Sequence, residues 1–212
     1  MPGGEDRSSA RKHLRFSEPL GRGFYDRPTR TVARELLGQW LVHRLEGELR
    51  AARIVEVEAY LANKDEASHA YRGRTARNDS MFQAPGTLYV FRIHQVHCAN
   101  AVTRRGEAVL FRAGEPIDPG TMNTRGPGRL CRALSITRAE DGLDLTRSSV
   151  RVLRGSRPTE SIVLGPRVGI RRAAELRLRY SLRGNPWVSG PRFPGPTTVA
   201  RRRAGHLSFA HS

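Results

Sequence analysis

Apolar and polar residues alternate strictly over residues 54–60, the pattern that predicts a β-strand. Successive side chains of a strand point to opposite faces, so the two valines and the alanine of this segment share one apolar face. Glu56, Glu58 and Tyr60 share the opposite face, together with Ile54. Charged residues on a half-solvated sheet are ordinary, so this face alone does not distinguish a functional site from an exposed surface.

Other runs of β-branched and aromatic residues predict further strands along the chain. We expect strands over residues 40–45, 49–60, 88–93, 109–113, 150–153, 162–164, 167–170 and 176–182. Glu46-Gly47 predicts a turn that joins the first two strands into a hairpin, and residues 94–100 are expected to form the tip of another. The connecting segment 61–85 is polar and has the composition of a loop.

Two short helices are expected between these strands. Residues 31–37 carry an apolar stripe, preceded by a helix start at Asp26-Arg27-Pro28 and followed by a glycine cap at Gly38. Residues 126–134 begin as a glycine-rich turn and continue as a helix; the free backbone N–H groups of such a turn could hold a phosphate, although turns of this kind are common. The fold class is therefore α+β, a single domain with one curved, mostly antiparallel sheet and short helices.

The two ends of the chain differ in composition from its middle. Residues 1–15 are polar and basic and predict a flexible N-terminal tail, without the apolar core of a signal peptide. Residues 190–212 are rich in proline, glycine and arginine and predict a second mobile tail. Residues 16–189 are expected to form the one folded domain, since no internal repeat indicates another.

The chain is strongly basic: 37 Lys and Arg against 20 Asp and Glu give a formal net charge of +17 over 212 residues. Lys12 and Lys64 are the only lysines, and arginine binds phosphates in a bidentate manner, so a polyanionic partner is expected, nucleic acid foremost. A genomic bias toward arginine would explain the choice of arginine, but not its excess over acids. An anionic membrane is the other conceivable surface, but no apolar run reaches the length of a membrane span.

Cysteine and histidine usage argues against disulfides and metals. Cys98 and Cys131 are too few for a disulfide framework and lack the spacing of zinc ligands, which indicates a reducing, cytoplasmic interior. His94 and His97 lie close to Cys98, but they are expected to point to opposite faces of a strand. We therefore expect no metal and no cofactor.

Several residues near the central strand also have plain structural interpretations. Tyr60 and Phe91 could be core aromatics, His69 a hydrogen-bonded loop residue and Arg112 a surface residue at a strand end. The segment after the strand changes this interpretation. A histidine and an arginine- and glycine-rich loop lie within about twenty residues of the two carboxylates. So many charged and titratable side chains in one segment favour a functional site.

A series of motifs carries a family resemblance. They are Arg53-Ile54-Val55-Glu56-Val57-Glu58-Ala59-Tyr60, Asp65-Glu66-Ala67-Ser68-His69, Arg77-Asn78-Asp79-Ser80-Met81-Phe82, Pro85-Gly86-Thr87-Leu88-Tyr89-Val90, Val109-Leu110-Phe111-Arg112-Ala113, Gly126-Pro127-Gly128-Arg129-Leu130-Cys131, Arg167-Val168-Gly169-Ile170 and Arg183-Gly184-Asn185-Pro186-Trp187-Val188-Ser189. In this order, and over roughly residues 18–189, they resemble the alkyladenine (3-methyladenine) DNA glycosylases, which remove alkylated purines.

The resemblance implies a mechanism. A base inside a duplex cannot be attacked at its sugar bond, so it is flipped into a pocket. Glu58 matches the general base that deprotonates a water for attack at C1′. Arg112 and the backbone carbonyl of Val168 match the groups that help to hold that water. Glu56, two residues further from the tyrosine, is expected to matter far less.

The resemblance also implies how the flipped base is bound. Tyr60 and Phe91 match the two faces of an aromatic sandwich, and Phe91 stands where the family usually has tyrosine; phenylalanine keeps the stacking surface and loses only the hydroxyl. His69 matches a residue that contacts the edge of the base. Asn100 matches a residue that crowds the 2-amino group of normal guanine.

A β-hairpin that inserts into DNA is part of the resemblance, and here the chain departs from the family. The family usually has a tyrosine wedge followed by glycine and methionine, whereas this chain has His94-Gln95-Val96 in a segment that is one residue shorter. His94 takes the wedge position; its ring is smaller than that of tyrosine and can carry charge. Contacts to the DNA backbone are expected from Arg72, Arg74, Arg77, Gly128 and Arg129.

The implied function is a monofunctional DNA glycosylase that excises alkylated or deaminated purines with water and leaves an abasic site. Its expected partner is double-stranded DNA containing damaged purines, bound by a monomer in the cytoplasm, at the nucleoid in a bacterium, with no membrane involved. A bifunctional enzyme would need an amine nucleophile, for which Lys64 is the one lysine in the motif region. A non-catalytic damage-sensing or architectural DNA-binding protein is the remaining alternative.

Overall fold

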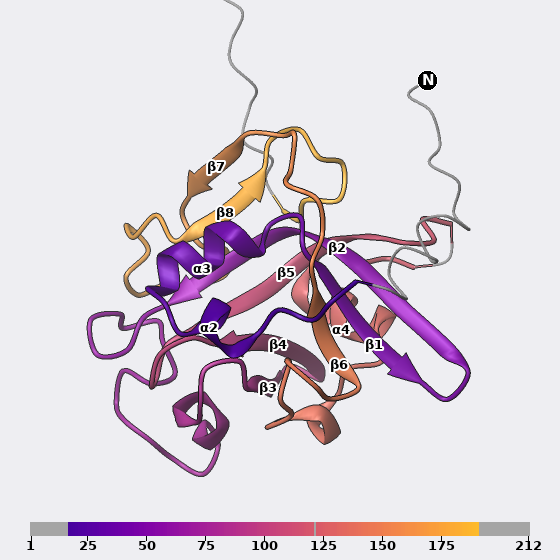
Figure 1. Cartoon of the computed structure of the whole chain (residues 1–212). Coiled ribbons are helices and arrows are strands. Elements are labelled where there is room, and N and C mark those ends of the chain that lie inside the picture. The colour runs from indigo at the N-terminus through magenta and orange to yellow at the C-terminus, as the bar shows by residue number, and fades with distance from the viewer. Residues whose placement is uncertain (1–16, 121, 191–212) are drawn as a thin grey trace, which may run out of the picture.

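β2 (Glu48–Tyr60) is the longest strand of the protein, and the rest of the sheet is assembled around it (Figure 1). The computed structural model describes residues 17–120 and 122–190. One edge of β2 pairs with β5 (Ala108–Pro116). Along the other edge, β1 (Trp40–Leu45) pairs with the first half of β2 and β8 (Arg179–Leu182) with the second.

The remaining elements extend this arrangement into one curled antiparallel sheet. Its strand order is β3-β4-β5-β2-β1-β6, and β7 joins it by pairing with β8. The further strands are β3 (Leu88–Ile93), β4 (Val96–Val102), β6 (Val150–Leu153) and β7 (Ile162–Gly165), and the helices are α2 (Arg22–Tyr25), α3 (Thr29–Leu36), α4 (Pro127–Ala133) and the single-turn η1 (Asp79–Phe82) and η2 (Arg138–Glu140). The predicted α+β class with a single domain is confirmed.

Two of the predicted strands need correction. The segment 167–170 is a loop, because Arg167 turns into the interior toward Asp65 and Gly169 takes a left-handed conformation with φ +78°. The strand predicted over residues 176–182 is confined to β8. The predicted tip over residues 94–100 is also too long, since β4 already begins at Val96 and pairs with β3 on one side and β5 on the other.

The central strand contains an irregularity that alternation does not reveal. The pairing between β2 and β5 is irregular at Glu56, while the residues on either side of it pair in the same register. Ile54 lies in the same apolar cluster as Val55 and Val57. The apolar face of Val55, Val57 and Ala59 is confirmed, since all three are fully buried in this cluster.

β3 and β4 form a hairpin with a two-residue turn. His94 and Gln95 both have positive φ, 43° and 68°, the combination of a type I′ turn. Such turns usually contain Asn-Gly, because most side chains disfavour this region. The turn is exposed, and so is Ile93 beside it, with 46% of its surface accessible.

Helix α4 supports the base of this hairpin. It packs against β4 and β5, and its Leu130 and Cys131 join the main apolar cluster. A Cβ atom on Gly128 would lie 2.7 Å from the Cβ of Val96, so glycine is required here for close packing against β4. Within the described residues, none of the helices is long and apolar enough to cross a membrane. The predicted tails at 1–15 and beyond Gly190 lie outside those residues.

Candidate active site

Four neighbouring strands contribute side chains to a cavity of about 200 Å³. Tyr60 comes from β2, Phe91 from β3, Asn100 from β4 and Arg112 from β5; His69 and Val168 join them from loops. The further lining residues are Ala67, Met81, Tyr89, Ile93, Cys98, Leu110, Pro127, Gly169 and Ile170. Six residues that the sequence singled out are thus brought together from positions more than 100 residues apart.

Glu58 has no accessible surface, and its carboxylate is held by three residues of this lining. One oxygen, Oε1, accepts a hydrogen bond from the backbone N–H of Val168 at 2.8 Å and lies 3.3 Å from a guanidinium nitrogen of Arg112. The other, Oε2, accepts from the hydroxyl of Tyr60 at 2.9 Å. Burial raises the pKa of Glu58 above its ordinary value, and the charge of Arg112 opposes that shift. Burial and the charge of Arg112 thus shift the basicity of Glu58 in opposite directions.

Glu56 is equally buried and is the centre of a network that sequence reasoning missed. Its Oε1 accepts from Nε of Arg112 at 3.1 Å and from Nε of Arg179 at 2.6 Å, while Oε2 accepts from the backbone N–H of Ser189 at 2.6 Å. The Ser189 hydroxyl in turn accepts from Arg112 at 3.2 Å. Arg112 is therefore fixed between the two glutamates. No Asp or Glu follows Glu175 in the sequence. This absence was the available signal that Arg179 needs an acidic partner from an earlier part of the chain.

The ring of Tyr60 is fixed by a second buried ion pair. The guanidinium of Arg167 lies over it, 4.6 Å from the ring centroid, as in a cation–π contact. Arg167 binds Asp65 through two hydrogen bonds of 2.6 and 2.7 Å and donates to the carbonyl of Ala59. Because Arg167 covers one face of the ring and Tyr60 also lines the cavity, the other face is available to a ligand. Asp65 and Arg167 both lay within quoted motifs, but their pairing required the fold.

The opposite side of the cavity is a wall of three rings. His69 lies edge-to-face against Phe91 with centroids 4.5 Å apart, and its Nδ1 is 2.8 Å from the hydroxyl of Tyr89. Burial lowers the pKa of His69, so the ring is neutral near pH 7, and it raises the pKa of Tyr89, which keeps its hydroxyl protonated. A tyrosine hydroxyl that donates to Nδ1 leaves the hydrogen on Nε2 of the histidine.

Asn100 fixes its amide nitrogen on the carbonyls of Tyr89 and Cys98, at 3.0 and 3.4 Å, which leaves its amide oxygen for the cavity. The thiol of Cys98 also lines the cavity, and burial raises its pKa to about 11, so it is a neutral, weakly polar surface. Lys64 is exposed in a turn and does not line the cavity.

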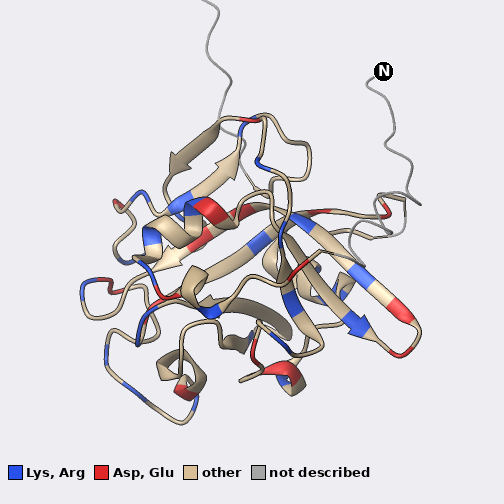
Figure 2. Cartoon of the chain, viewed as in Figure 1, with Lys and Arg blue, Asp and Glu red and all other residues tan. Residues whose placement is uncertain are grey.

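The predicted DNA-contacting residues lie outside the cavity. Arg72, Arg74 and Arg77 are exposed on the loop between β2 and β3, where Figure 2 shows several basic positions. Arg74 pairs with Asp79 at 2.6 Å. His94 is exposed in the hairpin turn, while its neighbour Ile93 reaches the rim of the cavity.

Gly128 and Arg129 lie in and beside the first turn of α4. The small size of Gly128 has a packing cause, as the contact with Val96 shows, and Arg129 lines a separate hollow. No group of three or more His, Cys, Asp or Glu within residues 17–120 and 122–190 is arranged to hold a metal ion.

A cavity walled by aromatic rings, with a buried carboxylate beside it in a strongly basic chain, has the features of an enzyme that acts on nucleic acid. The sequence model of the family described as Methylpurine-DNA glycosylase (MPG) matches residues 23–186, and the chain belongs to this family of DNA repair enzymes. The predicted family is confirmed.

Relatives from bacteria and archaea carry corresponding names. A protein of Anaeromyxobacter dehalogenans (strain 2CP-1) named "Putative 3-methyladenine DNA glycosylase" is 51% identical over 81% of this chain and 86% of its own length. Proteins with the same name from Rhodopirellula baltica and Methanocella arvoryzae are each 42% identical, over 82% and 83% of this chain and 84% and 98% of their own lengths.

Proposed function

We propose that this protein is a monofunctional DNA-3-methyladenine glycosylase. It flips a damaged purine, alkylated or deaminated, out of double-stranded DNA and hydrolyses the bond between the base and its sugar, leaving an abasic site. The observation that carries the proposal is the buried carboxylate of Glu58, held by Arg112, Val168 and Tyr60, three residues that line the aromatic cavity. Residues 16–189 form the catalytic domain, and the protein acts as a monomer.

Glu58 acts as the general base. A water molecule attacks C1′ and forms the new C–O bond, its proton passes to the carboxylate, and the C1′–N bond breaks with its electron pair leaving on the base. The negative charge of Glu58 also stabilises the positive charge that develops on the sugar. The raised pKa brings Glu58 closer to the range in which a general base is effective. Arg112 and the backbone of Val168 hold the water and the carboxylate in place.

The flipped base stacks between Tyr60 and Phe91. The free face of Tyr60 and the ring wall of Phe91 and His69 bound the cavity on two sides and supply the stacking surfaces. His69 contacts the edge of the base. Asn100, with its amide nitrogen bound to backbone, crowds the 2-amino group of an undamaged guanine and so disfavours it.

The β3–β4 hairpin inserts into the duplex, and His94 fills the space that the flipped base leaves. Its position in the exposed turn next to the cavity rim supports this assignment. The bifunctional alternative needs an amine at the cavity, and the exposed position of Lys64 argues against it. A purely architectural DNA-binding protein would have no need of a buried, tightly held carboxylate.

Replacement of Glu58 by glutamine is the decisive test. Glutamine has the same shape but cannot take a proton at neutral pH, so Glu58→Gln should bind lesion DNA normally and lose excision by about a hundredfold or more. Single-turnover excision should be measured on duplexes with 3-methyladenine, 7-methylguanine, hypoxanthine or ethenoadenine, together with binding to each. Borohydride should trap no covalent adduct. Full activity of Glu58→Gln, or wild-type protein inert on all four duplexes, would contradict the proposal.

A further inference from the structure

A second hollow lies directly beside the proposed base cavity and shares three of its walls. It has a volume of about 530 Å³ and, like the cavity, is lined by His69, Tyr89 and Phe91. The side chains of these three residues are therefore common to both linings. The other lining residues are Thr75, Arg77, Asn78, Arg92 and Arg138.

Two of the three arginines in this groove keep an uncompensated charge. In the part of the chain that the structure describes, no carboxylate lies within ion-pair distance of Arg77 or Arg92; Arg92 contacts only the side-chain amide of Gln95, at 3.4 Å. Arg138 lies 3.3 Å from Asp141 and also donates to the carbonyl of Val90, so its charge is partly offset. The groove is thus positively charged, with an aromatic wall.

The groove is built in advance of any ligand. Asn78 is buried and donates to the carbonyls of His69 and Gly73, at 2.8 and 3.1 Å. Its oxygen accepts from the backbone N–H and the hydroxyl of Thr75, at 2.6 and 3.0 Å. These four bonds fix the loop that carries Arg77. Arg92 projects from β3, and Arg138 begins η2, which is closed at its start by a capping box.

We infer that this groove binds a backbone phosphate of the DNA strand that contains the flipped nucleotide, through Arg77, Arg92 and Arg138. The inference rests on the proposed function only in placing a base in the neighbouring cavity. A nucleotide with its base in that cavity has its sugar at the mouth, and the strand must continue past the rim. The groove is the positively charged surface that shares this rim, and arginine forks suit phosphodiester oxygens.

Another large hollow among the described residues is a poorer candidate. It is lined by Arg50, Arg129 and Arg132, but also by the carboxylates of Glu48 and Asp118. Arg50 is already paired with Glu48 at 3.1 Å. This hollow has no lining residue in common with the base cavity, so a flipped nucleotide would not direct the strand into it.

Binding of two duplexes to the full chain tests the inference, one with a stable abasic-site analogue and one undamaged. Arg92→Ala should weaken binding of the abasic duplex about tenfold, the loss of one charge-assisted contact, and reduce the slope of log affinity against log salt by about 1. The undamaged duplex, in which no nucleotide is flipped out of the stack, should be affected much less. Arg92→Lys should keep the salt slope.

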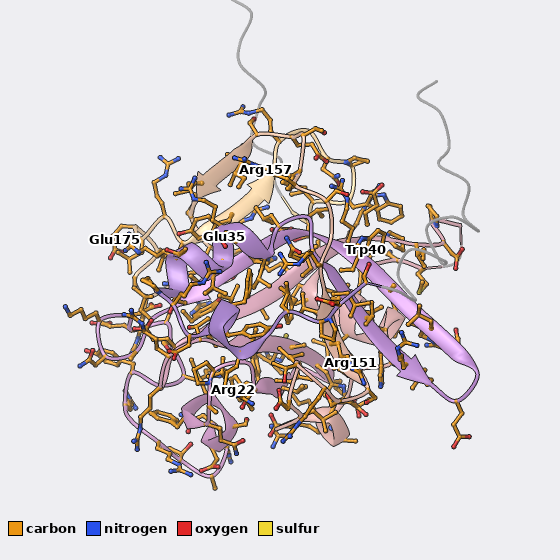
Figure 3. The ribbon with its side chains drawn as sticks, in the orientation of Figure 1. Arg22, Glu35, Trp40, Arg151, Arg157 and Glu175 are labelled. Carbon is orange, nitrogen blue, oxygen red and sulfur yellow. The ribbon has the colours of Figure 1, made fainter. Side chains whose placement is uncertain are left out.

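Arg157→Ala is the matched control, since Arg157 is exposed beside β7 and β8, far from β3 and β4 in the view of Figure 3. It should affect both duplexes equally and slightly. Unchanged affinity of Arg92→Ala for the abasic duplex, or equal losses of affinity for both duplexes, would overturn the inference. If the Arg92→Ala variant does not fold, Arg77→Ala is tested with the same two duplexes and the same criteria. Excision by the wild-type protein is measured separately. A wild-type protein that excises no base contradicts the proposed function, whereas unchanged binding by Arg92→Ala contradicts phosphate binding in the groove.

Discussion

At the scale of single residues, the site depends on how two glutamates two positions apart divide their roles. Both are fully buried, yet only Glu58 contacts Tyr60, whereas Glu56 binds two arginines and the backbone of Ser189. The negative charges of the two glutamates and the positive charges of Arg112 and Arg179 compensate each other in this interior. This compensation makes the burial of all four charged groups tolerable. In the proposed mechanism, Glu56 holds Arg112 in position beside the general base Glu58.

Replacement of Glu56 by glutamine should therefore be costly, contrary to the expectation from its distance to the tyrosine. Two buried arginines would lose a charged partner, and we expect a loss of about 3 kcal/mol in the free energy of unfolding, measured with urea. Excision should fall about tenfold or more, since Arg112 loses one of its two anchors. Wild-type stability and activity in Glu56→Gln would contradict this interpretation of the network.

The pH dependence of the same variant separates positioning from simple damage. With Glu58 as the proposed general base, excision should fall as the pH drops through the pKa of that group, which burial raises and to which the negative charge of Glu56 contributes in the same direction. Removing that charge should lower the pKa of Glu58. The acidic limb of the single-turnover rate profile should move to lower pH in Glu56→Gln, an effect that a merely loosened fold would not produce.

At the scale of elements, the β3–β4 hairpin combines a rigid base with a strained turn. The packing of Val96 against Gly128 fixes its base, while the turn places two residues with ordinary side chains in the left-handed region. Strain of this kind persists where the surrounding structure imposes it, and it often accompanies function.

Gln95→Gly should relieve part of this strain and stabilise the protein by about 0.5–1 kcal/mol, because glycine adopts positive φ without steric cost. Gln83→Gly is a suitable control: Gln83 is exposed with φ −81°, and glycine there should bring no gain. Urea unfolding of both variants is the measurement. A destabilised Gln95→Gly protein would mean that the contact of Gln95 with Arg92 outweighs the strain.

The wedge role of His94 is testable on the same hairpin. His94→Ala should weaken base flipping, because the vacated stack remains unfilled, and His94→Tyr should restore it with a larger ring. Fluorescence of a flipped base analogue in the wild type and both variants reports this directly. Flipping that is unchanged in His94→Ala would assign the wedge to another residue of the tip, with the exposed Ile93 first.

At the scale of the whole molecule, the net charge of +17 predicts duplex binding that weakens steeply with salt, since each neutralised phosphate releases counterions. Truncation after Ser189 removes Arg192, Arg201, Arg202 and Arg203. Affinity should then fall alike for all sequences, while single-turnover excision at saturating enzyme is kept. A flat salt titration, or loss of single-turnover excision on truncation, would contradict the prediction.

Local sequence patterns determined much of this protein. Alternation predicted β1 and β2 and the apolar face of Val55, Val57 and Ala59, because side-chain direction in a strand depends only on position along the chain. The ordered motifs determined the family and named six of the residues that meet in the cavity. Composition predicted a polyanionic partner, as the DNA repair family implies.

Tertiary structure alone decided which charges meet. Glu56 with Arg179, and Asp65 with Arg167, are pairs separated by more than 100 residues, and no local period encodes such a distance. The pairing of β4 with two neighbours shortened the hairpin tip to two residues. Buried ion pairs and strand register follow from contacts that form only when the sheet closes, because burial is what makes an unpaired charge or a misplaced apolar face costly.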